Sequence, residues 1–401
     1  MTLTSTTGLL GAGPGEVLGL FRAGGALTRA EVMDRTGLSR STVNQRIDLL
    51  LEAGLIVGRD PDVQPGRGRG RPAGSFAFHG EGGVLLVCDI GATAMRAALC
   101  DLTGAVRLDI PLASAVTDGP EAVLTRVEGL FAELLQRSEH SPDDVAGIAL
   151  SVPGPVDHEQ ATVVSPPIMT GWDRFDVRGW FARTYACPLL LEKDATAMAW
   201  GEYRTHHPEA DTMVMVKLGT GVGSGIIAGG RIHRGADGAA GDIGHTQLGV
   251  DNDDAPLCRC GNRGCVEASA GGWAMLRDLK AAGREVETVD DLVERIRVAD
   301  PEAVALARAA GRTLGIALSE AVNLLNPRVV VIGGQLAEAE EQIFAGLREM
   351  VYSRSLPLAT RRLELQRSRL DVRAGSVGLA LLLADHIFAP HRIDARLLPS
   401  P

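Results

Sequence analysis

The sequence predicts a small N-terminal winged helix-turn-helix domain, followed by a larger α/β domain of two lobes. Two short helical segments joined by a glycine turn indicate the first part, and two strands that end in glycine-rich turns indicate the second. At 401 residues the chain is too long for one ordinary domain. We expect the winged helix in residues 1–80, the first lobe in 81–200, the second lobe in 201–375, and a C-terminal helix that returns to the first lobe, with a tail, in 376–401.

The composition is typical of a soluble globular protein, with 45% hydrophobic and 22% charged residues. The sequence contains no apolar run of the length, about eighteen residues, that a transmembrane helix needs. The N-terminus has neither the basic start nor the long apolar core of a signal peptide. We therefore expect a cytoplasmic protein without membrane contact. In the reducing cytoplasm a tight cluster of cysteines indicates a metal site rather than disulfides.

The formal net charge of −10 is unevenly distributed along the chain. Residues 1–80 contain nine arginines and seven acidic residues, whereas the remainder is strongly acidic. Contact with nucleic-acid phosphates requires only a local positive potential. The charge pattern is therefore compatible with a small DNA-reading module attached to an acidic body.

Residues 15–57 are expected to be helical throughout. Thr28 and Glu31 have the spacing of a capping box, in which each side chain satisfies a free backbone N–H group of the other residue. Gly37 ends that helix, and Ser39 can cap the next one. The second helix has apolar residues at helical spacing and a glycine where it should end; these are Val43, Ile47, Leu50, Leu51 and Gly54.

The polar residues near the start of the second helix are candidates for DNA contact, because they lie off its apolar face: Arg40, Ser41, Thr42, Asn44 and Gln45. Residues 55–57 and 75–78 are expected to form a β-hairpin wing around a Gly-Arg repeat. Its arginines, Arg67, Arg69 and Arg71, fit a narrow minor groove. The alternatives are an ordinary helical hairpin and a flexible charged linker.

Both lobes are expected to begin with strands. In the first lobe these are Val84–Ile90, Met95–Leu99, Ala105–Ile110, Gly147–Ser151 and Leu189–Leu191, with a helix from Ala195. In the second lobe the expected elements are a strand Thr212–Leu218, a helix Pro301–Leu325 and a strand Val329–Ile332. The opening strands, with Asp-x-Gly-x-Thr after the first, resemble the start of the actin-like, RNase H-like ATPase fold of sugar kinases. Since each lobe opens with a strand and a glycine-rich turn, the lobes are expected to be distant repeats.

Two glycine turns are candidate phosphate sites, because successive backbone N–H groups in such turns can point at one anion. The first contains Asp89, Gly91 and Thr93, and the second contains Gly219, Thr220 and Gly221. Each turn alone is a weak signal. Their occurrence at the ends of two strands in a two-lobed chain is a stronger one.

The metal motif consists of His245, Cys258, Cys260 and Cys265. One imidazole and three thiolates form a complete tetrahedral set for Zn²⁺, and intervening glycines allow the chain to fold back sharply. No coordination position remains for water, so we expect a structural zinc within an insertion of the second lobe. The alternative is a chance cluster of thiols.

Residues 81 to about 385 resemble the ROK family of sugar kinases and sugar-responsive repressors. The matching segments are residues 89–93, 152–157, 192–196, 219–225, 238–245, 258–267 and 326–334. The zinc segment that follows Gly-x-Ile-Gly-His is highly specific to that family. Together with the winged helix, the chain is similar to the repressor branch, which includes xylose and N-acetylglucosamine repressors.

The resemblance implies a sugar site between the lobes. It puts Asp194 in the place of the base that deprotonates the sugar hydroxyl in the kinases, beside Lys193. Asp242, His245 and Glu267 correspond to residues that hold other sugar hydroxyls. The alternatives are a helix cap for Asp194 and solvated loop charges for Asp242 and Glu267.

The chain departs from the kinase pattern at three places in this site. Lys193 replaces the usual asparagine before the aspartate, Asp242 replaces a glutamate, and Ala92 replaces a glycine of the first phosphate turn, which is followed by Ala94 where a basic or amide residue is usual. These changes argue against phosphoryl transfer and against a need for ATP. The Lys193 ammonium could instead favour an acidic ligand, or could point to solvent.

The sequence therefore predicts a sugar-responsive, zinc-stabilised transcriptional regulator of carbohydrate-related genes that acts as a repressor. A symmetric homodimer or homotetramer would read a palindromic operator. Ligand binding between the lobes would change operator affinity. The alternatives are an active ATP-dependent sugar kinase with an appended DNA-binding domain, and a DNA-binding protein whose effector lobes bind a protein partner.

Overall fold

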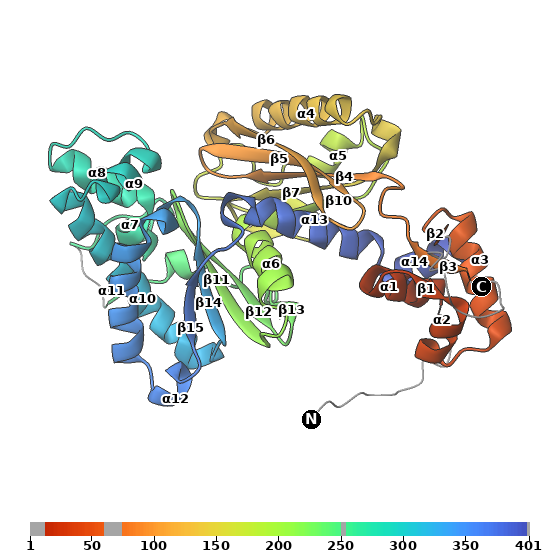
Figure 1. The fold of residues 1–401 in the computed structure, drawn as a ribbon. Helices are drawn as coiled ribbons and strands as arrows, with labels where there is room; N and C mark the ends of the chain where they lie inside the picture. The colour runs from red at the N-terminus through yellow and green to blue at the C-terminus, as the bar shows by residue number, and fades with distance from the viewer. Residues whose placement is uncertain (1–12, 60–73, 250–253, 399–401) are drawn as a thin grey trace.

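The computed structural model describes residues 13–59, 74–249 and 254–398 (Figure 1). Its N-terminal domain has three helices and a small antiparallel sheet in the order β1-β3-β2. The helices are α1 (Pro14–Gly24), α2 (Arg29–Thr36) and α3 (Arg40–Glu52). The strands are β1 (Leu27–Thr28), β2 (Ile56–Arg59) and β3 (Ser75–Phe78). The expectation of helix throughout residues 15–57 is wrong at β1 and at the start of β2, because both strands pair with β3, which lies later in the chain.

Local capping accounts for the helix boundaries of this domain. Thr28 and Glu31 form the expected capping box at the start of α2, with Thr28 N donating to the Glu31 carboxylate at 2.7 Å. The Ser39 side chain accepts from Thr42 N at the start of α3. Gly54, with a φ of +68°, follows the end of α3 in the left-handed conformation that glycine adopts without strain.

The first lobe contains a five-stranded sheet in the order β10-β7-β4-β5-β6. Its strands are β4 (Val84–Ile90), β5 (Ala94–Asp101), β6 (Val106–Ala113), β7 (Val145–Val152) and β10 (Leu189–Lys193). Alternate residues of β4 enter two different cores. Leu86 and Cys88 pack with helix α4 (Pro120–Arg137), whereas Leu85 and Val87 face the opposite side. The small elements β8 (Val156–Asp157), β9 (Thr162–Val163) and α5 (Val177–Phe181) complete this lobe.

The second lobe repeats that topology, as expected, with a sheet in the order β13-β12-β11-β14-β15. Its strands are β11 (Thr212–Leu218), β12 (Val222–Ala228), β13 (Arg231–Ile232), β14 (Val329–Gly333) and β15 (Glu364–Arg367). In each lobe an antiparallel hairpin is followed by two further parallel strands. The helices are α7 (Glu267–Ala270), α8 (Gly272–Ala281), α9 (Val289–Arg297), α10 (Pro301–Leu325), α11 (Glu340–Arg354) and α12 (Pro357–Thr360). The two-lobed fold class is therefore confirmed.

Two closely packed helices lie between the lobes. Helix α6 (Asp194–His206) begins directly after β10 and packs against β11, β12 and α13 (Ala374–Ile387). Gly201 and Gly378 allow this proximity: an added Cβ at Gly378 would lie 1.8 Å from Ala197 O, and one at Gly201 would lie 2.6 Å from Ala374 O. The absence of side chains at both positions therefore brings the two helix backbones into direct contact.

Helix α13 also reaches the N-terminal domain (Figure 1). It runs across the face of the first-lobe sheet opposite α4 and leads into α14 (Pro390–Leu397), which packs against α1. The core of the N-terminal domain is continuous with this helix pair and with one face of the first-lobe sheet. Among the described residues no single helix could span a membrane. The bent pair of residues 371–387 and 390–397 passes a test of length and composition, but its apolar side chains belong largely to this core.

Candidate functional site

A cleft of about 370 Å³ lies between the two lobes. Both glycine turns line it, and so do all five residues that the resemblance associated with a sugar: Lys193, Asp194, Asp242, His245 and Glu267. The carboxyl ends of β4 and β10 in the first lobe and of β11 in the second lobe open into it. The cleft therefore brings together residues that are up to 286 positions apart in the chain, from Asp89 to Gly375.

The first glycine turn is held by its own backbone and by Asp89. Gly91 N donates to Ala94 O at 2.8 Å, and the Asp89 carboxylate accepts from Ser151 Oγ at 2.6 Å. Burial raises the pKa of Asp89 against the opposing effects of Lys217 and of the Ser151 hydrogen bond. The turn that follows β11 is tight as well, because Gly219 N donates to Gly221 O at 3.0 Å.

The Asp194 carboxylate forms an ion pair with a lysine that the sequence analysis missed. Lys217 Nζ donates to Asp194 Oδ2 at 2.6 Å, and the two side chains are only 22% and 8% exposed. Burial opposes the charged form of Lys217, but Asp194 and Asp89 nevertheless hold its pKa above the ordinary value. The signal available in the sequence was a single charge within the apolar strand Thr212–Leu218. The other Asp194 oxygen accepts from Ala195 N at 2.6 Å, so Asp194 is the first residue of α6 and Lys193 is its N-cap.

Lys193 points into the cleft and forms a hydrogen-bonded ion pair with Asp242. The lysine side chain is 9% exposed and that of Asp242 is 41% exposed, so the cation is buried and its partner lies at the rim. Lys193 therefore does not point to solvent, whereas Asp242 remains a partly exposed loop residue. In this state the pair occupies Asp242, one of the groups that the resemblance associates with sugar hydroxyls.

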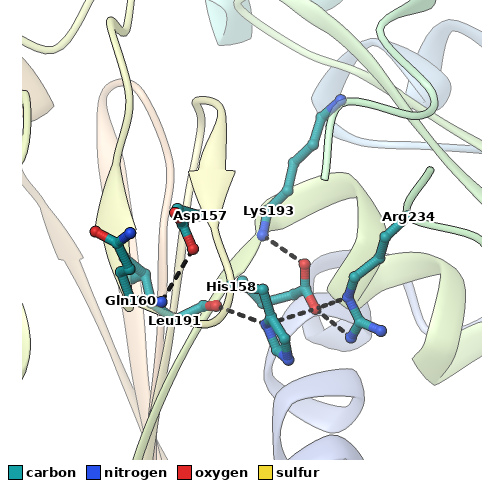
Figure 2. A network of polar contacts seen from close by, with 7 residues as sticks. Asp157, His158, Gln160, Leu191, Lys193 and Arg234 are labelled. Carbon is teal, nitrogen blue, oxygen red and sulfur yellow. Dashed lines mark hydrogen bonds and ion pairs between the residues drawn. The ribbon is translucent and has the colours of Figure 1, made fainter. Parts of the chain in front are cut away.

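The neighbouring residue Glu192 forms a third pair across the lobes. Its Oε2 accepts from Arg234 Nη2 at 2.6 Å and from Nε at 3.1 Å, and its Oε1 accepts from the Lys193 backbone N at 3.0 Å. Figure 2 shows His158 and Arg234 on the same side of this network, while the Lys193 side chain points away from them.

Three consecutive residues of the first lobe thus meet three opposite charges of the second lobe. We call the pairs Glu192–Arg234, Lys193–Asp242 and Asp194–Lys217 the charge ladder. The signs alternate along the first-lobe strand end, and each of the three charges pairs with a different residue of the second lobe. A ligand that hydrogen-bonds to Asp194 displaces Lys217, and one that hydrogen-bonds to Asp242 displaces Lys193. The displaced lysine then needs a new partner.

Glu267, at the start of α7, is fixed at the floor of the cleft. Its Oε2 accepts from Val222 N at 2.9 Å and its Oε1 from Trp273 Nε1 at 3.2 Å. Gly221 allows this approach, since a Cβ there would lie 2.5 Å from Glu267 Oε2. Glu267 is therefore buried and oriented, in contrast to the solvated loop charge that was the alternative.

The four residues of the metal motif converge. The candidate ligand atoms of His245, Cys258, Cys260 and Cys265 all lie within 4.8 Å of one another. The Cys260 and Cys265 sulfurs are 3.7 Å apart, close to the ~3.8 Å that two thiolates span in a tetrahedral zinc site. His245 Nδ1 lies 3.8 Å from Cys258 Sγ, and the same residue lines the cleft. The cluster is compatible with a structural zinc held beside the candidate ligand site.

The candidate DNA-reading side chains differ in their accessibility. Arg40, Ser41 and Gln45 of α3 are exposed, and Thr42 is half-buried. Asn44 Oδ1 is buried and has no hydrogen-bond partner in the described part of the chain, so this oxygen does not face outward as the helix pattern suggested. The wing residues Arg67, Arg69 and Arg71 lie outside the described residues.

The N-terminal domain is joined to the cleft through one shared carboxylate. Asp385 of α13 accepts from Arg22 of α1 at 3.1 Å and from Arg204 at the far end of α6 at 2.5 Å. Helix α6 therefore has Asp194 of the cleft at one end and, near the other, Arg204, which shares Asp385 with Arg22 of the N-terminal domain. In addition, Asp394 of α14 accepts from Gly15 N at 2.8 Å.

Comparison with known proteins agrees with this architecture. The xylose repressor of Bacillus subtilis (strain 168) is 26% identical over 367 residues, covering 90% of this chain and 91% of the relative. The glucokinase of Thermotoga maritima is 28% identical over 322 residues, covering 76% and 98% of the two chains. Among solved structures, a ROK family transcriptional regulator, a homologue of the E. coli MLC protein, superposes with a TM-score of 0.79 at 26% identity and covers 96% of this chain and 98% of that one.

Two family models match the chain. A helix-turn-helix domain model matches residues 15–59, and the ROK family model matches residues 85–386. Since the second model spans well over half of the chain, this protein belongs to the ROK family.

Proposed function

We propose that the protein is a sugar-responsive, DNA-binding transcriptional repressor of carbohydrate-related genes that acts in the cytoplasm. The observation that carries this proposal is the continuous connection from the cleft to the N-terminal domain through Asp194, Arg204, Asp385 and Arg22. A ligand that changes the position of α6 acts on α13, whose Asp385 pairs with Arg22 of α1 and which continues into α14. The likeness to a xylose repressor and to a ROK family transcriptional regulator along almost the whole chain supports the same function.

The proposed ligand site is formed by Asp194, Asp242, His245 and Glu267. Carboxylates accept hydrogen bonds from sugar hydroxyls, and a histidine bound to zinc through one ring nitrogen can present the other to the cleft. A sugar would compete with Lys193 and Lys217 for the two aspartates and so rearrange the charge ladder. Operator affinity would change because the two lobe arrangements bind the ligand with different strengths.

The proposed DNA surface combines the start of α3 with the wing. Arg40, Ser41, Thr42, Asn44 and Gln45 would contact the major groove or its phosphates, with Asn44 restricted to its amide nitrogen. Arg67, Arg69 and Arg71 would enter the minor groove. A homodimer or homotetramer would match a palindromic operator.

The proposed zinc is structural. His245, Cys258, Cys260 and Cys265 would use all four coordination positions, so the ion would stabilise the loop beside the cleft and activate no water. Its binding free energy would contribute to folding, and its bond to His245 would fix the orientation of that imidazole.

A sugar kinase is the second candidate, favoured by the retained Asp194 and by the two glycine turns of the cleft. A general base must be available to the hydroxyl proton that it removes. Asp194 Oδ2 instead accepts from the Lys217 ammonium at 2.6 Å, so this oxygen is engaged in an ion pair and is not free to take up that proton. We therefore propose that the site senses its ligand without turnover and that ATP is dispensable.

The test begins with genome-wide mapping of the DNA bound by the protein, since the neighbouring genes identify the pathway. A recovered site is then used in fluorescence anisotropy with xylose, glucose and N-acetylmannosamine, the sugars suggested by the names of the relatives. We expect one sugar class to change operator affinity at least tenfold in the parent and not in Asp194→Asn. No sequence-specific DNA binding, or robust sugar-dependent ATP turnover by the parent, would contradict the proposal.

A further inference from the structure

A second, smaller cavity of about 160 Å³ lies behind the cleft, where the first lobe, the second lobe and α13 meet. Its apolar wall includes Leu190 of β10 and Leu379 and Leu382 of α13. A cavity of this size, about 150 Å³, holds one benzene-sized molecule. It therefore has room for a ligand of about six non-hydrogen atoms with an apolar portion.

The remainder of the cavity lining is polar, and two of its groups have unused hydrogen-bonding capacity. Glu192, Arg234, His158 and His386 line this side. Arg234 uses Nε and Nη2 for Glu192, which leaves Nη1 without a partner among the described residues. His386 likewise has no hydrogen-bond partner within the described part of the chain.

The charges around the cavity favour an anion. The pKa of His386 is lowered to about 4. Burial is the main cause, and repulsion of the protonated imidazole by Arg392, His158, His391 and Arg178 contributes as well. At neutral pH this imidazole is uncharged and offers one N–H donor. Glu192 is the one carboxylate of the lining, and Arg234 already neutralises it. The lining thus holds one carboxylate that is already paired, while two arginines outside it, Arg178 and Arg392, lie close enough to act on His386.

We propose that this cavity binds a small organic carboxylate whose hydrocarbon portion lies against Leu190, Leu379 and Leu382. The free Nη1 of Arg234 and the neutral imidazole of His386 donate to the carboxylate. Inorganic phosphate shares the negative charge but offers no apolar surface to the leucine wall, so it binds more weakly.

The position of the cavity makes its occupant a second effector, and this part of the inference rests on the proposed repressor function. The lining joins Arg234 of the second lobe to Glu192, the residue before Lys193 of the cleft. It also contains His386, the residue after Asp385, which bonds Arg22 of α1. An occupant thus contacts both lobes and the helix that meets the DNA-binding domain.

The test for binding uses the full chain and isothermal titration calorimetry at constant ionic strength, with butyrate, hexanoate and inorganic phosphate as probes. We expect butyrate to bind at one site per chain, at least tenfold more tightly than phosphate. Leu382→Phe fills the cavity and keeps every charge, so it should weaken butyrate binding at least tenfold. Leu382→Ala enlarges the cavity and should shift the preference toward hexanoate. Leu356→Phe, at an exposed position of the second lobe, is the matched control and should bind as the parent does.

The regulatory part is tested by measuring operator affinity with saturating butyrate. A change of threefold or more in the parent and in Leu356→Phe, but not in Leu382→Phe, supports the second effector. Butyrate binding without any change in operator affinity overturns that part alone. No butyrate binding, equal binding of butyrate and phosphate, or unchanged binding in Leu382→Phe overturns the site itself.

Discussion

Replacing Lys217 by Met tests whether the Asp194 carboxylate depends on its ion pair. The substitution removes the ammonium that lies 2.6 Å from Asp194 and leaves two aspartates, Asp194 and Asp89, without it. Loss of one partner of a fully buried pair costs about 3–5 kcal/mol. Because the Lys217 side chain keeps 22% of its exposure, water screens part of the effect, and we expect a loss of about 2–4 kcal/mol in the free energy of unfolding.

The measurement is a double-mutant cycle by urea unfolding, with Lys217→Met, Asp194→Asn and the double variant. If the two side chains stabilise each other, the double variant should be more stable than the sum of the single effects predicts, by about 1–3 kcal/mol. The pKa of Lys217 is raised in the folded protein, so its contribution is fully present below the ordinary lysine pKa and is lost as pH rises through the folded value.

The Lys217→Met penalty should also shrink between pH 7 and pH 5. Burial raises the pKa of Asp89 above its unfolded value, and removal of the opposing Lys217 ammonium raises it further, so the folded variant gains stability as Asp89 takes up a proton. Lys280→Met is the matched control, because Lys280 pairs with Glu287 at 2.8 Å with side chains that are 46% and 82% exposed. Its expected cost is below ~1 kcal/mol. Equal costs for the two lysine variants, or strict additivity in the cycle, would refute the reasoning.

Four further predictions concern the connection, the metal, the ligand and the DNA. Asp385→Ala should leave sugar affinity nearly unchanged but reduce the sugar-induced change in operator affinity at least threefold, as measured by anisotropy, and an unchanged response would exclude the connection through α13. Elemental analysis should find one zinc per chain in the parent and none in Cys260→Ser, and the variant should melt at a lower temperature. Full stability of a metal-free parent would show that no structural metal is needed. Lys193→Asn should shift ligand preference toward neutral sugars in calorimetry, since it removes the buried ammonium and frees Asp242; an unchanged preference would mean that Lys193 takes no part in selection. Changing Arg69 and Arg71 together to Ala should weaken operator binding more than roughly tenfold and flatten its salt dependence, and parent-like binding would rule out a minor-groove role.

Features set by short sequence spacing were predictable from the residues alone. The capping box joins Thr28 and Glu31, which are only three peptide bonds apart, and both of its hydrogen bonds are present. The helix Pro301–Leu325 and the strand Thr212–Leu218 have the expected limits, because each has a marked apolar pattern and clear terminal residues.

Features set by the meeting of distant segments were not predictable in the same way. The partner of Lys193 lies 49 residues later, and Arg22 meets Asp385 across 363 residues. Charged residues are common on protein surfaces, so nothing in the local sequence marks which two will pair. The gathering of the cleft residues could be expected from the family motifs, whereas the occupation of its aspartates by Lys193 and Lys217 depended on the packing of the two lobes.

The packing of α14 against α1 has a consequence for synthesis of the protein on the ribosome. The N-terminal domain emerges first, but α14 and α13, which complete its apolar cover, are made roughly 300 residues later. At 5–20 residues per second this delay is about 15 to 60 s. Nascent chains therefore display an incompletely covered helix α1 until α14 has been synthesised, and the DNA-binding domain assembles fully only after both effector lobes have been made.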